Sequence, residues 1–310
     1  ACQQIRSEQI RDRFLNFNKR TVPIGNFKIP KDWLGSFEDR HWSHHYSELV
    51  DLGLMDKKIP IYNVEHHKSH SSSAFRTRDW DSNVCILSFD GKGDNLSHST
   101  LLGYADGSTE LFRVSSSKNS LGAFYQAVTE SLGFVPVDGE YKTMGLAALG
   151  KSNATNPFNE IMSVENGVLR STLEWEYRPY NINNPNKQVN NPLSSVVQTD
   201  VFKKHLDFMS QEDFAYAAQT VFEETALELV KQSLKLTKTK KLALAGGCAL
   251  NVKANMRMVE ELDLDEFYVF PDSGDSGNSI GAALETYFQI YGKTSENLKN
   301  MYLGTSFSNE

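Results

Sequence analysis

The chain has 310 residues, enough for one large or two smaller domains with a substantial core. Its net charge is -7 with acidic and basic residues interspersed, which argues against a nucleic-acid or membrane-surface binder, since these carry a basic patch. No stretch has the roughly 20 apolar residues of a membrane span. Three cysteines without a CxxC motif indicate neither a disulfide framework nor a thiolate zinc site, so a cytoplasmic location is expected.

The first 60 residues carry two helical patterns and a short strand pattern. Residues 5–18 have apolar side chains at near-helical spacing and predict an amphipathic helix, and a second helical segment is predicted at 41–54. The apolar residues 59–62 predict a short buried strand. The first candidate site follows directly after this strand.

That site lies in the segment 64–75, VEHHKSHSSSAF. Its Ser and Ala content without Gly or Pro permits a helix, and a helix that begins near Glu65 places His66 and His70 on one face. Two neutral imidazoles at this spacing form half of a site for a divalent transition metal. The alternative is a histidine pair on a solvated face; the glutamate of an HExxH zinc protease is absent.

The middle of the chain predicts three strands and then helices. Strands are expected at 84–91, 98–105 and 108–115, separated by turn residues, and together they form a meander. Helical patterns follow at 120–133 and 139–151. The polar segment 151–210 is expected to be an irregular excursion with little buried surface, either a lid or acceptor-site insertion or a surface loop.

The last third alternates between helix and strand. An apolar stripe predicts a long helix at 211–236, and four further elements follow it as strand, helix, strand and helix: 241–247, 249–262, 266–270 and 276–291. A meander followed by this alternation is the order of one half of a duplicated RNase H-like fold.

Two glycine-flanked loops follow strands of this last third. Gly246 and Gly247 lie between a strand and a helix, where backbone amides can approach an anion or a ribose, and Asn251 could bond a sugar hydroxyl. The alternative is a tight turn without a ligand. Asp275 could either cap the last helix or project into a cleft at the carboxyl end of a strand, and Asp90 is placed similarly. Two imidazoles with one or two carboxylates suit Fe(II), Mn(II) or Zn(II).

Several motifs together resemble a known family. HHxxHxxSAF, the DGxG after a strand, GExKxMGLAxxG, AGGxALNxxAN and PxSGDSGxxIGAA resemble the NodU/CmcH-type O-carbamoyltransferases, the TobZ-like family. They are more distantly similar to the TsaD-type proteins of tRNA threonylcarbamoylation and to part of HypF. The similarity runs from about residue 60 to the end, in family order.

This resemblance implies an α/β fold of the ASKHA type (actin/Hsp70-like, duplicated RNase H-like), partly truncated at the N-terminus because residues 1–30 lack the family's phosphate-contacting hairpin. Residues 1–82 would be the remainder of the first subdomain, and 83–310 the second subdomain with the polar insertion at about 151–210. A YrdC-like domain, which makes carbamoyl-adenylate from ATP and carbamoyl phosphate, is expected outside this chain. We therefore expect a fragment that is incomplete as an enzyme.

The resemblance also implies the site residues and the reaction. The expected metal ligands are His66, His70, Asp275 and Asp90, around a divalent ion of the iron type. The residues expected near the adenylate are Gly246, Gly247, Asn251, Glu140 and Lys142. The carbamoyl group would pass to a hydroxyl of a small molecule, such as a sugar or natural product. The alternatives are a non-catalytic ASKHA module that binds nucleotide and metal and acts through a partner, and a tRNA threonylcarbamoyl-type transferase, against which the acidic balance counts.

Overall fold

The computed structural model describes residues 64–152, 156–175, 198–292, 297–302 and 304–307. The chain divides into two compact units, Ala1–Val64 and Glu65–Glu310, and the description below concerns the second. The predicted helices at 5–18 and 41–54 and the strand at 59–62 lie outside the described residues.

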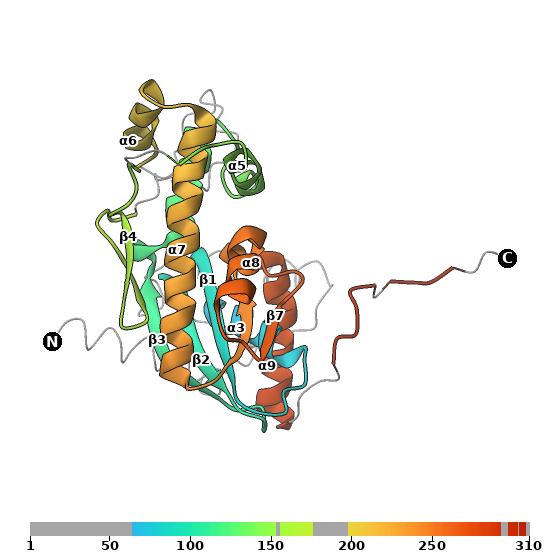
Figure 1. Ribbon diagram of the computed structural model, residues 1–310. Coiled ribbons are helices and arrows are strands. Elements are labelled where there is room, and N and C mark those ends of the chain that lie inside the picture. The colour runs from blue at the N-terminus through green and yellow to red at the C-terminus, as the bar shows by residue number, and fades with distance from the viewer. Residues whose placement is uncertain (1–63, 153–155, 176–197, 293–296, 303, 308–310) are drawn as a thin grey trace, which may run out of the picture. The chain divides into compact units, whose positions relative to one another are not determined.

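A five-stranded mixed sheet forms the centre of this unit (Figure 1). Strands β1 (Val84–Gly93), β2 (Leu96–Gly103) and β3 (Thr109–Ser116) are antiparallel neighbours, so the predicted meander is confirmed. The β1–β2 pairing runs in register up to Phe89 and shifts between Phe89 and Gly93. Asp90 therefore follows the regular part of β1.

Strands β6 (Lys241–Ala245) and β7 (Glu266–Val269) extend the sheet on the other side of β1, and the strand order is β3-β2-β1-β6-β7. β6 is parallel to β1 and β7 is parallel to β6. Because the carboxyl ends of parallel strands meet at one edge of a sheet, the loops that follow β1, β6 and β7 come together there.

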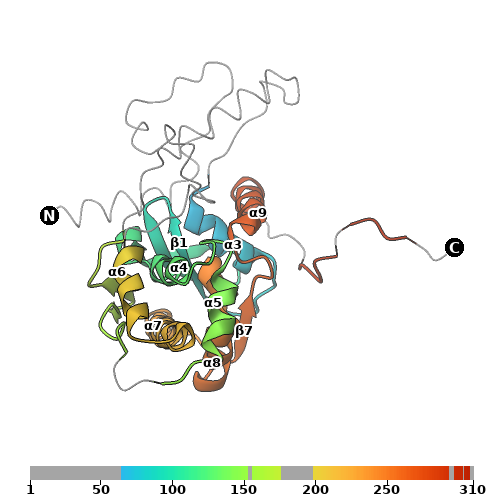
Figure 2. The same ribbon diagram turned by 90° about the horizontal axis from the view of Figure 1, so that it is seen from above.

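Helices cover both faces of the sheet (Figure 2). On one face α3 (His66–Arg76) contacts β1, β2 and β6, and α9 (Asn278–Tyr291) packs along α3. On the other face lie α4 (Leu121–Ser131) and α7 (Gln211–Thr237), while α5 (Glu140–Ala147) and α8 (Val252–Glu261) pack against α7. With both faces covered, every residue of β2 is buried.

The long helix α7 shows how sequence pattern determines an element. Ser210 caps its N-terminus, since its side chain accepts a hydrogen bond from the amide of Asp213 at 3.1 Å. Its apolar stripe is buried, and Lys238 ends it in the left-handed conformation with φ 55°. The prediction of a helix at 211–236 is confirmed.

The expectation for residues 151–210 was wrong in its described parts. The hairpin β4 (Met162–Glu165) and β5 (Val168–Ser171) and the helix α6 (Thr199–Lys203) lie there. Phe158, Trp175 and Phe202 from this segment are buried in the core with Phe124 of α4, at ring-centroid distances of 5.1–6.1 Å. A few large aromatic side chains bury enough surface to anchor a segment that is polar on average.

Short 3-10 helices connect several elements: η3 (Ser117–Asn119), η4 (Lys204–Asp207), η5 (Gly247–Leu250) and η6 (Asp275–Gly277). Because η5 begins at the second of the two glycines and extends to Leu250, the helix predicted from residue 249 begins only at Val252. Among the described helices, none combines the length and the apolar character needed to cross a membrane.

Candidate metal centre

Helix α3 presents two imidazoles at its N-terminal end. Glu65 caps the helix, because its Oε2 accepts a hydrogen bond from the amide of Lys68 at 2.7 Å, so the predicted start near Glu65 is confirmed. His66 and His70 share one face, with their Nε2 atoms 3.1 Å apart. His67 lies on another face, buried, with Nδ1 2.8 Å from Ser88 Oγ. The spacing of the histidines therefore produces the geometry expected of a two-imidazole half-site.

Asp90 reaches the same point from the end of β1. Its Oδ2 lies 3.1 Å from Nε2 of His66 and 3.5 Å from Nε2 of His70. Its Oδ1 accepts a hydrogen bond from the amide of Gly247 at 3.1 Å. The loop after β6 thus fixes the carboxylate of Asp90 near the carboxyl end of β1.

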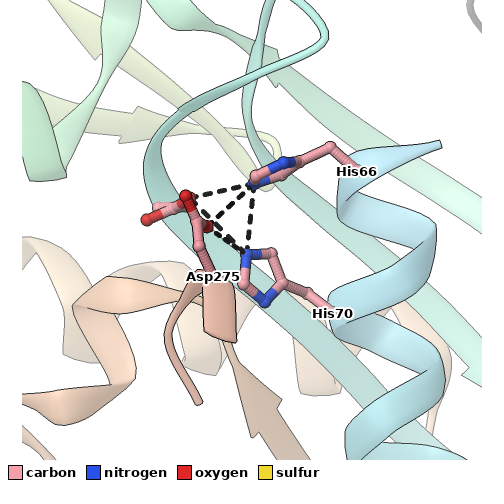
Figure 3. Close-up of side chains that lie close together, drawn as sticks. His66, His70 and Asp275 are labelled. Carbon is pink, nitrogen blue, oxygen red and sulfur yellow. Dashed lines mark hydrogen bonds and ion pairs between the residues drawn. The ribbon is translucent and has the colours of Figure 1, made fainter. Parts of the chain in front are cut away.

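Asp275 reaches this point from η6, in the loop after β7 (Figure 3). Its Oδ1 lies 3.2 Å from Nε2 of His70 and 3.4 Å from Nε2 of His66. Neither η6 nor α9 has a side-chain cap, so Asp275 faces the imidazoles and does not cap the last helix. Its side chain is 72% exposed, whereas that of His70 is 1% exposed, so the group opens to solvent on the Asp275 side.

His66, His70, Asp90 and Asp275, hereafter the His–Asp cluster, offer four ligand atoms that all lie within 4.8 Å of one another. The distances from each Nε2 to the other Nε2 and to the two carboxylate oxygens are 3.1–3.5 Å. Ligand atoms bound to one ion at about 2.1 Å are about 3.0 Å apart at right angles and about 3.4 Å apart at the tetrahedral angle. The spacing and the two-imidazole, two-carboxylate chemistry therefore fit a divalent transition metal.

The carboxylates favour positive charge at this point. Burial lowers the pKa of His66, but the hydrogen bond and charge of Asp90, followed by the charges of Asp275 and Glu65, outweigh it and raise that pKa to about 9. Burial is likewise outweighed at His70, where hydrogen bonds with Asp275 and Asp90 raise the pKa. Burial raises the pKa of Asp90, but hydrogen bonds from the two imidazoles hold it well below its usual range.

Two further residues contact the cluster, and the sequence reading missed both. The backbone amide of His66 donates to Asp94 Oδ2 at 2.9 Å, which ties the start of α3 to the turn after β1. Asn278, the first residue of α9, places Nδ2 3.2 Å from Nε2 of His70. Both follow a predicted aspartate by three or four residues, and this proximity in sequence is the signal that could have identified them.

The glycines after β6 have structural reasons of their own. Gly246 has φ +94°, and a Cβ there would lie 2.2 Å from the carbonyl oxygen of Phe89. A Cβ on Gly247 would lie 2.8 Å from Asp90 Oδ1. The structure thus brings Gly247 to the His–Asp cluster, while Gly246 permits the close passage of β6 and β1.

Asn251 makes its side-chain hydrogen bonds within the chain. It caps α8, because Oδ1 accepts from the amide of Ala254 at 3.1 Å. Its amide also pairs with that of Gln219, at 3.0 and 3.1 Å, and the residue is 7% exposed. The predicted contact of Asn251 with a sugar hydroxyl stays a prediction.

Glu140 and Lys142 lie at the start of α5. The carboxylate of Glu140 accepts from the amides of Val137 at 2.8 Å and Gly139 at 3.1 Å, and burial raises its pKa. Burial also raises the pKa of the Cys248 thiol, with further contributions from the charges of Asp90 and Glu140, so Glu140 acts electrostatically on the loop after β6. Lys142 is exposed, with Nζ 5.6 Å from the centre of the Tyr141 ring. The predicted place of both residues near the adenylate stays a prediction.

Several known proteins are similar to this chain over part of their length. The protein sll1178 of Synechocystis sp. is 29% identical over 279 residues, covering 85% of this chain and 43% of that protein. The nodulation protein NolNO of Sinorhizobium fredii is 28% identical over 256 residues, covering 80% of this chain and 34% of that protein. The chain therefore spans half or less of the length of these relatives. A crystal structure of T. kodakarensis HypF is 16% identical, with a TM-score of 0.42, over 83% of this chain and 40% of that one.

The family comparison covers most of the chain. The family model described as "Carbamoyltransferase N-terminus" matches residues 34–284, a range that includes every residue of the His–Asp cluster. The predicted resemblance to carbamoyltransferases is thereby confirmed. This chain belongs to the carbamoyltransferase N-terminal family.

Proposed function

We propose that this chain transfers a carbamoyl group from carbamoyl-adenylate to a hydroxyl of a small-molecule acceptor, such as a sugar or natural product, with the His–Asp cluster holding a divalent metal. The observation that carries the proposal is the convergence of four ligand atoms within 4.8 Å. Family membership supports carbamoyl transfer as the type of reaction. The two-imidazole, two-carboxylate set suits Fe(II) first, with Mn(II) and Zn(II) as alternatives.

In this proposal the chain's own residues position the reacting groups. A bound divalent ion would supply Lewis-acid polarisation of the carbamoyl carbonyl. His70 and Asp90 are held rigidly, the first by its burial on α3 and the second by the amide of Gly247. Asp275 lies on the exposed side of the cluster, where donor and acceptor can enter.

The reaction itself is a substitution at the carbamoyl carbon. The acceptor oxygen forms a bond to that carbon, the bond from the carbon to the phosphate oxygen breaks, and adenylate leaves while the hydroxyl proton is released. We propose the loop at Gly246 and Gly247 for the adenylate side, together with Asn251, Glu140 and Lys142. A YrdC-like domain in a longer polypeptide would make carbamoyl-adenylate from ATP and carbamoyl phosphate.

We also propose that the fold is of the ASKHA type. The strand order β3-β2-β1-β6-β7, with an antiparallel meander and two further parallel strands, supports one RNase H-like half. In such sheets ligands bind outside the carboxyl ends of the parallel strands, which is where Asp90, Gly247 and Asp275 lie.

The experiment has two readouts on the same samples. Metal content is measured by mass spectrometry on the chain purified without added metal or chelator, beside His66→Ala/His70→Ala. Synthetic carbamoyl-adenylate is then supplied with a panel of sugars and other alcohols, and carbamoylated product and adenylate are quantified. Because the chain is expected to be incomplete as an enzyme, metal content is the deciding readout: we expect stoichiometric metal with the native chain and none with the double variant, and any product only with the native chain. Equal metal content and equal transfer in both proteins would overturn the proposal.

A further inference from the structure

Asn278 contacts the His–Asp cluster, but it is not one of the four residues that form it. It is the first residue of α9, and its Nδ2 is 3.2 Å from Nε2 of His70. Its Oδ1 is buried and has no hydrogen-bond partner among the residues that the structure describes. Because this oxygen gains no hydrogen bond from the described residues where it lies, no partner among them fixes the observed orientation of the amide.

The crowding around His70 makes the observed orientation of Asn278 incompatible with a bound cation. Nε2 of His70 faces Nε2 of His66 at 3.1 Å and Asp275 Oδ1 at 3.2 Å, in addition to Asn278. A nitrogen that binds a metal has no lone pair left to accept an N–H bond. The amide hydrogens of Asn278 would then have no acceptor at His70 and would face a positive charge.

Rotation of the terminal amide by a half-turn removes this conflict, because it brings Oδ1 to the place of Nδ2. The oxygen would then lie about 3.2 Å from Nε2 of His70, within the separation of about 3.0–3.4 Å between atoms that bind one ion. Amide oxygens are accepted ligands of hard divalent cations.

We propose that Asn278 supplies a fifth ligand, through Oδ1, to the metal held by the His–Asp cluster, and that it thereby biases the site toward Mn(II) or Fe(II) over Zn(II). This inference rests on the proposed metal-binding function. The bias follows because protein zinc sites are mostly four-coordinate with nitrogen and sulfur ligands, whereas an additional oxygen favours a harder ion with a larger coordination number.

The test measures binding of Mn(II) and of Zn(II) to the whole chain by equilibrium dialysis and metal analysis. Asn278→Leu keeps the side-chain size and removes the oxygen, Asn278→Asp keeps an oxygen, and Ser279→Ala is the control. The hydroxyl of Ser279 donates to the carbonyl of Ser276 at 3.1 Å, and the residue is exposed.

We expect Asn278→Leu to raise the dissociation constant for Mn(II) about tenfold and that for Zn(II) by much less, with Asn278→Asp restoring Mn(II) binding. The electron paramagnetic resonance spectrum of bound Mn(II) should also differ between the native chain and Asn278→Leu. If Asn278 has only a structural role, Asn278→Leu weakens the binding of both metals equally and lowers the melting temperature of the metal-free chain. That result overturns the proposal.

The outcomes also separate this inference from the proposed function. If Asn278→Leu binds both metals like the native chain while His70→Ala binds neither, the fifth ligand is wrong and the metal centre stands. If the native chain binds neither metal, both fail.

Discussion

Two polar clusters lie along the packed helices α3 and α9, and they differ in whether their charges and hydrogen bonds are matched within the cluster. The His–Asp cluster lies where both helices begin, and a second group, Lys68, Arg76 and Glu285, hereafter the Glu285 cluster, lies further along them. In the Glu285 cluster, Oε2 accepts from Ser72 Oγ at 2.7 Å and from Arg76 Nε at 2.8 Å. Oε1 accepts from Gln289 Nε2 at 2.8 Å and lies 3.5 Å from Lys68 Nζ.

The cations of the Glu285 cluster also have further partners. Lys68 Nζ donates to Thr109 Oγ1 at 2.6 Å, and Arg76 donates to the carbonyl of Gly107 at 3.1 Å. Burial raises the pKa of Glu285, but the charges of Lys68 and Arg76 outweigh it and lower that pKa to about 2. The group is closed: opposite charges and hydrogen-bond donors match.

The His–Asp cluster is not closed in this sense. Once the imidazoles release their protons, as binding to a metal requires, two imidazole nitrogens and two carboxylate oxygens face one another with lone pairs, and a cation between them is the missing partner. The comparison teaches that a buried polar cluster whose charges and hydrogen bonds are matched internally stabilises the fold. A cluster whose acceptor atoms converge on one point indicates a ligand.

Asp90→Asn should have the largest effect, because it removes a charged ligand atom that is mostly shielded from water. Substitution of groups that merely support metal ligands costs about 10–100-fold in affinity, so loss of a ligand should cost more than about 100-fold. Equilibrium dialysis against Zn(II) measures it. The control is Asp272→Asn, in the same loop as Asp275. The carboxylate of Asp272 accepts a hydrogen bond from Ser276 Oγ at 2.6 Å, and Asp272 is not part of the His–Asp cluster. Equal affinities in the two variants would contradict the metal centre.

Glu285→Gln should destabilise the Glu285 cluster without changing metal binding at the His–Asp cluster. It leaves two buried cations without their counter-charge, and we expect the free energy of unfolding in urea to fall by about 3 kcal/mol. Glu261→Gln is the control: Glu261 is exposed and forms an i,i+4 pair with Arg257, so its loss should leave the free energy of unfolding almost unchanged. Metal stoichiometry should stay native. A loss of stability no larger than in the control would show that the Glu285 cluster contributes little.

The same variant predicts a pH dependence. The pKa of Glu285 is about 2 in the folded chain and 4.5 for a free glutamate side chain, so its charge stabilises the fold fully above pH 4.5 and loses this effect as the pH falls toward 2. The difference in unfolding free energy between native chain and Glu285→Gln should therefore be constant from pH 5 to 7 and shrink below pH 4.5. A difference that grows on acidification would have the wrong sign.

How far the sequence predicts these features depends on the range of the interactions. The helix at His66, the meander and the long helix at 211–236 were predictable because each depends on local periodicity. The approach of Asp90 and Asp275 to the histidines follows from their positions after parallel strands, and resemblance to a family added to that argument.

Interactions between distant residues were not predictable in this way. Glu285 and Arg76 are 209 positions apart, and no local pattern pairs them. Phe158, Trp175 and Phe202 are isolated in a polar segment, so average hydropathy concealed their place in the core. The role of Asn251 as a cap of α8 depends on where that helix begins, and boundaries are the least certain part of a sequence-based prediction.

Gly281→Ala tests whether the two clusters are independent, because this residue lies between them on α9. A Cβ there would be 1.8 Å from the carbonyl oxygen of Ser69 and 3.0 Å from the amide of Ser73, so α3 and α9 must move apart. We expect the unfolding free energy to fall by about 2 kcal/mol. Affinity for Zn(II) should fall about tenfold, because His70 and Asp275 separate with the helices.

Gly145→Ala in α5 is the matched control, since a Cβ there meets nothing within 4 Å. It should be neutral or stabilise the chain by up to about 1 kcal/mol, because alanine restricts the unfolded state and favours helix. If Gly281→Ala loses stability but keeps native affinity for Zn(II), the His–Asp cluster is positioned by the sheet edge alone. If Gly281→Ala loses both stability and affinity for Zn(II), the packing of α3 on α9 sets the separation of the metal ligands. The Glu285 cluster then supports the His–Asp cluster by holding these two helices together.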